Sequence, residues 1–96
     1  MRKQRFRIAT EAAAELIRQG NIVFSPITMT HPIDVVLADE GATLGSEYWV
    51  EFDEAFMDMC TEMLVLQADG WDRSSGIRRE IKYFRRQQKP VRYVAP

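Results

Sequence analysis

Two acidic side chains, Asp53 and Glu80, fall on the apolar sides of two predicted helices. When each residue is set about 100° further round a helix, Glu80 lies next to Phe84. On the same basis Asp53 lies in an apolar stripe between Trp49 and Cys60. Burying an unpaired carboxylate is costly, so two inward acids indicate either a half-buried catalytic pocket or a structural role. The structural role would be an acid near a helix start for Glu80 and a buried hydrogen bond for Asp53.

A polar loop with two glycines follows an apolar run in the C-terminal third of the chain. Met63–Leu66 gives way to Gly70–Gly76, and a helical pattern follows. A loop between a strand and a helix start directs backbone N–H groups and a positive helix end at an anion or a sugar. Ser74 and Ser75 are also typical N-cap residues, a role compatible with a ligand contact. Trp71 could cover a nucleobase or pack the loop down.

Helices and strands alternate along the chain. Apolar spacing predicts helices over 4–18, 31–37, 48–60 and 75–88, and strands over 21–24, 62–67 and 91–94. Ser25-Pro26 is expected to close the first strand and open a loop. Alternating strands and helices imply parallel pairing, so we expect a single α/β domain over 1–96, with an open parallel sheet of the flavodoxin-like or Rossmann-like kind and helices on both faces.

Charge is unevenly distributed over the 96 residues, although the formal net charge is only −1. Residues 40–62 contain seven acids and no Lys or Arg, whereas residues 73–92 contain eight bases and one acid. The net charge gives no reason to expect nucleic acid as a partner, and the basic segment is typical of a solvated helix face.

The remaining composition excludes several classes of site. A single cysteine, Cys60, rules out an internal disulfide and suits a reducing compartment, and His31 with Asp34 is too sparse for a metal site. We therefore expect no metal and no cofactor. Apolar runs are too short to span a bilayer and no signal-peptide core is present, so a cytoplasmic location without a membrane partner is expected.

Three segments resemble the nucleoside deoxyribosyltransferase-like family, which includes deoxynucleotide N-hydrolases. They are residues 20–26, residues 30–32 and, above all, residues 70–80, and the similarity in element order runs from about Gln4 to Val94. The resemblance implies cleavage or transfer at the N-glycosidic bond of a 2-deoxyribonucleoside or its monophosphate. It is closest to a branch of small bacterial and phage proteins.

The resemblance also implies roles for particular residues. The family's nucleophilic glutamate, six residues after a polar loop residue, matches Glu80 after Ser74, and an aspartate one helix earlier matches Asp53, which would assist departure of the base or orient the sugar. Ser74, Ser75 and Gly76 would hold the sugar 5-oxygen or a phosphate. Trp71 would border the base.

The chain departs from this family at its start. Family members begin with a strand and loop, whereas here Met1 is followed almost at once by a helix. Three explanations are open: a reading frame that starts upstream, which we favour, a sheet that closes up without the strand, or a strand supplied by another subunit.

A homo-oligomer is expected, because family members are commonly oligomers and small parallel sheets expose edges that invite association. Two other functions remain open, a nucleotide-binding module without turnover and a nucleic-acid binder that uses the basic helix.

Overall fold

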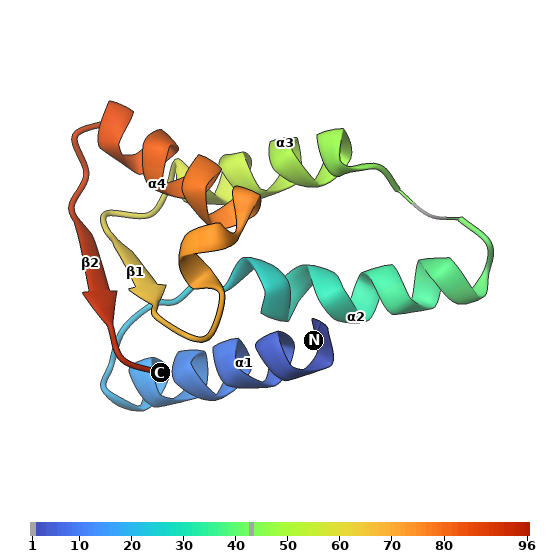
Figure 1. Ribbon diagram of the computed structural model, residues 1–96, viewed down its shortest axis with the longest axis horizontal. Helices are drawn as coiled ribbons and strands as arrows, with labels where there is room; N and C mark the ends of the chain where they lie inside the picture. Colours follow the sequence, from blue (N-terminus) through green and yellow to red (C-terminus); the bar gives the residue numbers. More distant parts are fainter. Residues whose placement is uncertain (1, 43) are drawn as a thin grey trace. The chain divides into compact units, whose positions relative to one another are not determined.

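The computed structural model describes residues 2–42 and 44–96, and the chain divides into two compact parts, Met1–Asp58 and Met59–Pro96. The elements, in chain order, are α1 (Arg2–Arg18), α2 (Pro26–Asp39), α3 (Ser46–Met57), β1 (Met63–Leu66), the 3₁₀ turn η1 (Trp71–Arg73), α4 (Ser75–Arg86) and β2 (Val91–Val94). The described residues thus form a small mixed α/β fold with four α-helices and one two-stranded parallel sheet (Figure 1). No helix among them is long and apolar enough to cross a membrane.

In the first part, α1 and α2 pack side by side (Figure 1). Thr10 Oγ1 and Thr28 Oγ1 share a hydrogen bond of 2.9 Å, and the rings of Phe6 and His31 lie 4.8 Å apart. The chain reverses after α1 at Gly20, whose φ of 93° belongs to the left-handed region that glycine enters at little cost.

The strand predicted over 21–24 does not form, and this expectation was wrong. These residues have no regular secondary structure, and Ile22 is fully exposed at 104%. The Phe24 ring stacks on Phe56 at 4.9 Å instead of entering a sheet. A short apolar run forms a strand only where another strand accepts its backbone hydrogen bonds, and among the described residues only β1 and β2 pair with one another.

The loop predicted after Ser25-Pro26 was also wrong, because α2 begins there. Pro26 occupies the first turn of the helix, where a proline nitrogen would lack an intrahelical partner in any case. The short helix predicted over 31–37 is confirmed but forms only the centre of α2. Pro32 lies inside α2, and the helix continues past it to Asp39.

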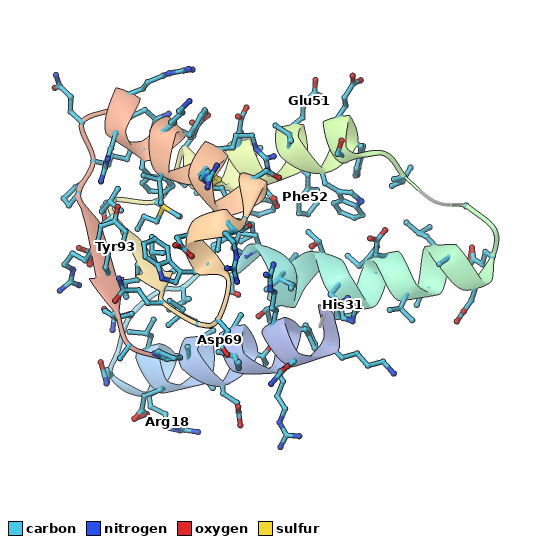
Figure 2. The ribbon with its side chains drawn as sticks, viewed as in Figure 1. Arg18, His31, Glu51, Phe52, Asp69 and Tyr93 are labelled. Carbon is cyan, nitrogen blue, oxygen red and sulfur yellow. The ribbon has the colours of Figure 1, made fainter. Side chains whose placement is uncertain are left out.

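Helix α3 carries a row of aromatic rings. Phe52 lies 5.4 Å from Trp49 and 5.1 Å from Phe56, with edge-on and tilted geometries that aromatic pairs favour. Figure 2 shows Phe52 and Glu51 on opposite sides of the helix, as the apolar spacing predicted. The helix ends at Met57, so the predicted extension to Cys60 was wrong and that cysteine lies outside the stripe.

In the second part, β1, α4 and β2 form one strand–helix–strand unit. The two strands are parallel, with Met63 opposite Val91 and Leu66 opposite Val94, and α4 packs against both. Val65 and Phe84 are its most buried side chains, at 2% and 4% exposure. A helix between two parallel strands is the connection that parallel pairing requires.

The two strands and the helix predicted for this part are confirmed, and only the residues at which they end differ from the prediction. The last strand matches its prediction, and β1 is one residue shorter at each end than the predicted 62–67. Helix α4 ends at Arg86, two residues before the predicted end at Gln88, which lies outside the helix. Its φ of 59° is left-handed, and Lys89 N–H donates to the Phe84 carbonyl at 3.0 Å to close the helix end.

Candidate functional site

The candidate site is built at the carboxyl end of β1. The chain leaves the strand at Leu66, turns at Gly70 with a φ of 83°, makes the single turn η1 and enters α4 at Ser75. In parallel α/β sheets, ligands bind beyond the carboxyl ends of strands, where helix N-termini point. The order of elements in this part therefore places the predicted loop where such folds hold anions and sugars.

Ser74 closes the first turn of α4. Its Oγ accepts a hydrogen bond from the Ile77 N–H at 3.2 Å, which confirms the predicted N-cap, and its carbonyl accepts from Arg78 N–H at 3.1 Å. The Ser74 hydroxyl keeps its proton available as a donor while the oxygen acts as the cap. The amides of Ser75 and Gly76 come before the first of these bonds, at the positive end of the helix.

Gly76 has room for a larger side chain. A Cβ built there would lie 3.8 Å from the Ser74 Oγ, an ordinary contact distance. The helix start therefore does not depend on glycine at this position. Any role of Gly76 in binding would come through its backbone N–H.

Trp71 packs within the second part. Its ring lies 5.5 Å from that of Tyr93 on β2, whose hydroxyl accepts a hydrogen bond from Arg85 Nη2 at 2.8 Å. Figure 2 labels Tyr93 on this strand and Asp69 in the loop before η1. The indole is half-buried, so part of its surface is used in packing and the exposed remainder can border a ligand.

Glu80 lies in the middle of α4 and is half-buried. The preceding residue, Arg79, is exposed, and Phe84, one turn later, is buried at 4% exposure. Six residues separate Glu80 from Ser74, which is about 9 Å along a helix axis. Its Cα–Cβ bond, like that of every residue in an α-helix, tilts toward the N-terminal end of the helix.

Asp53 is a buried charged residue of α3, with only 8% of its surface exposed. The apolar stripe predicted an inward position for this carboxyl group, and the burial agrees with that prediction. Met57, one turn later, is also buried at 4% exposure. Water is therefore largely excluded from the Asp53 side chain, which favours a role for it other than surface solvation.

The structure brings five of the six predicted site residues into one part of the chain. These are Trp71, Ser74, Ser75, Gly76 and Glu80, all in η1, α4 or their junction. Asp53 belongs to the first part of the chain.

One contact and one unpaired donor at predicted site residues or their neighbours were not expected from the sequence. The Arg78 guanidinium donates from Nε at 3.0 Å and from Nη2 at 2.8 Å to the Asp72 carbonyl, which holds η1 against α4. The Trp49 indole N–H is buried and has no hydrogen-bond partner among residues 2–42 and 44–96. Trp49 precedes Asp53 by one helical turn.

A family model covers almost the whole chain. The family described as "Domain of unknown function (DUF1937)" matches residues 1–95. The chain belongs to this family. None of the curated proteins compared with it matches. The matched residues run from α1 to β2, so the DUF1937 family model covers both compact parts of the chain.

The DUF1937 chain also has a groove along α1 and α2 that contains none of the predicted site residues. The groove is lined by Lys3, Phe6, Arg7, Thr10, Glu11 and His31.

No group of three or more His, Cys, Asp or Glu side chains suited to a metal ion occurs in the described part of the chain. The candidate site itself presents carboxylate, hydroxyl and backbone amide groups.

Proposed function

We propose that this protein cleaves or transfers the N-glycosidic bond of 2-deoxyribonucleosides or their monophosphates. The observation that supports this most is the placing of Glu80. It is a half-buried carboxylate on α4, six residues after the serine that caps this helix, and the helix follows the carboxyl end of a parallel strand. A carboxylate nucleophile beside an anion-binding helix start suits a sugar carrying a 5-hydroxyl or 5-phosphate.

The proposed reaction has two steps. A Glu80 carboxylate oxygen attacks C1′, and the glycosidic electron pair leaves with the base, which receives a proton from the Asp53 carboxyl group. Water or a second base then attacks C1′, its proton passes to the Asp53 carboxylate, and the ester bond to Glu80 breaks. Water gives deoxyribose or its 5-phosphate, and a second base gives a new nucleoside or nucleotide. Double displacement by two carboxyl groups works at a separation of about 5–5.5 Å.

The remaining site residues take binding roles in this proposal. The Ser74 hydroxyl donates to the sugar 5-oxygen or a phosphate, and the Ser75 and Gly76 amides donate to the same group. Trp71 borders the base with the ring surface that Tyr93 leaves uncovered. We also propose that β1–α4–β2 is part of a flavodoxin-like sheet, because α4 connects two parallel strands and the loop follows the first of them.

Incubation with 2-deoxyribonucleosides and their 5′-monophosphates tests the proposal, with free base measured by chromatography. We expect base release that falls at least about a hundredfold in Glu80→Gln and in Asp53→Asn. Glu51→Gln is the matched control for the first variant, because Glu51 is an exposed acid on α3. Asp39→Asn, at the exposed end of α2, is the control for the second.

The possible outcomes are distinct. Unchanged base release in a folded Glu80→Gln protein would remove Glu80 as the nucleophile. A 2-fluoro-substituted deoxynucleoside, which slows the second step, should leave a sugar attached to the peptide that contains Glu80, detectable by mass spectrometry. Nucleotide binding without base release would establish instead a binding module that does not turn over its ligand.

We further propose that the protein forms a homo-oligomer. Helix α2 is apolar and has no buried residue, and it exposes Val35 at 47% and Val36 at 56%. Exposed apolar residues of this size commonly mark an association surface when they are clustered. Light scattering coupled to gel filtration should give a mass above the 11.2 kDa of one chain, and a mass equal to one chain would reject the proposal.

A further inference from the structure

The two parts of the chain carry opposite charge. Residues 59–96 contain eight Lys or Arg and four Asp or Glu, a net charge of +4, whereas residues 1–58 contain five bases and ten acids, a net charge of −5. The overall value of −1 averages these two. Electrostatic recognition depends on the local field, so the second part must be judged on its own charge.

The positive charge of the second part is concentrated on one face of α4. This basic face consists of the exposed residues Arg78, Arg79, Lys82, Arg85 and Arg86. On a regular helix these five lie within an arc of about 120° and span about 12 Å along the axis. The single acid of α4, Glu80, points the opposite way, with buried Phe84 on its side of the helix.

The basic face is not neutralised by acidic neighbours. The side chains of Arg79, Lys82 and Arg86 make no hydrogen bond or ion pair within residues 2–42 and 44–96. Arg78 and Arg85 donate to uncharged oxygens, those of the Asp72 carbonyl and the Tyr93 hydroxyl. These two bonds hold both guanidinium groups in place without cancelling their charge, which lowers the entropy lost when they bind an anion.

We propose that the basic face of α4 binds the phosphate backbone of double-stranded nucleic acid, without reading its sequence. Regularly spaced cations on a rigid helix match a regularly charged polyanion. The face contains no aromatic side chain, so it lacks the stacking platforms used on single strands. The apolar residues of α4 are half-buried (Ile77 and Ile81) or buried (Phe84), so the helix exposes no large apolar side chain to insert into a membrane.

This binding surface is separate from the proposed catalytic residue. A duplex seated on the basic face would lie on the side of α4 away from Glu80. The proposal therefore concerns a second function of the same helix, and it does not depend on N-glycosidic chemistry.

The test is the salt dependence of binding to a fluorescent duplex of arbitrary sequence, measured by anisotropy with the full chain. If all five basic residues contact phosphates, the affinity should fall about 500-fold between 50 mM and 200 mM salt. In the variant Arg79→Gln/Lys82→Gln/Arg86→Gln only two contacts remain, and the fall should be about 12-fold. Arg78 and Arg85 are left unchanged because their hydrogen bonds support the fold.

The matched control is Lys3→Gln/Arg5→Gln/Arg7→Gln, which removes the same charge from exposed positions of α1. We expect its duplex affinity and salt dependence to remain close to those of the natural chain. Equal losses in both triple variants would overturn the proposal, because binding would then follow net charge alone. Tighter binding to a single strand of the same length, or to vesicles rich in phosphatidylserine, would overturn it too.

Discussion

Removing the Ser74 hydroxyl should destabilise α4 by a measurable amount. The Ser74 Oγ accepts the Ile77 N–H at 3.2 Å, and alanine would leave that donor at a partly buried helix start without its acceptor. Loss of an N-cap side chain costs about 1 kcal/mol, within a range of about 0.5–2 kcal/mol. For a domain of this size, this corresponds to a fall in melting temperature of about 4–8 °C.

Circular dichroism during heating gives the global effect of Ser74→Ala, and hydrogen exchange gives the local one. We expect faster exchange at the Ile77 amide in particular, because its hydrogen bond is removed. Ser75→Ala is the control: Ser75 is an exposed neighbour whose side chain makes no cap bond, so the melting temperature should change by less than about 3 °C.

A second variant separates the cap from ligand binding. Ser74→Asp keeps an oxygen acceptor and adds a negative charge at the positive helix end, so stability should return to that of the natural protein. The same change removes the hydroxyl donor and repels a phosphate, so nucleotide affinity should stay low. Equal melting temperatures for Ser74→Ala and the natural chain, with unchanged Ile77 exchange, would refute the assignment of Ser74 as a structural cap.

Three further predictions concern the second part of the chain. Gly70→Ala should destabilise the protein by about 1–2 kcal/mol in urea unfolding, because φ is 83° there, whereas Gly76→Ala, with space for a Cβ, should cost nothing. Val65→Ala should cost about 2 kcal/mol by the same measurement, because this side chain is only 2% exposed. A double-mutant cycle on Arg92 and Glu62, which pair at 3.0 Å with largely exposed side chains, should give a coupling below about 1 kcal/mol that weakens with added salt.

Local signals in the sequence determined much of the second part. The serine before α4 is a cap because its side chain reaches an amide three residues away, and no distant contact is needed. Val91–Val94 could be predicted because Pro90 and the apolar residues mark its start and extent. The burial of Asp53 also followed from the sequence, since helical period alone assigns a residue to the apolar stripe.

Tertiary structure decided the features that depend on a partner. The sequence at 21–24 has the β-branched and aromatic residues of a strand, but a strand requires a neighbour for its backbone hydrogen bonds, and the Phe24 ring packs on Phe56 instead. The ends of α3 and α4 were overestimated by two or three residues because apolar spacing continues past the point where backbone hydrogen bonds stop. Periodicity thus determined which side of a helix each acid takes, whereas backbone pairing decided where the elements begin and end.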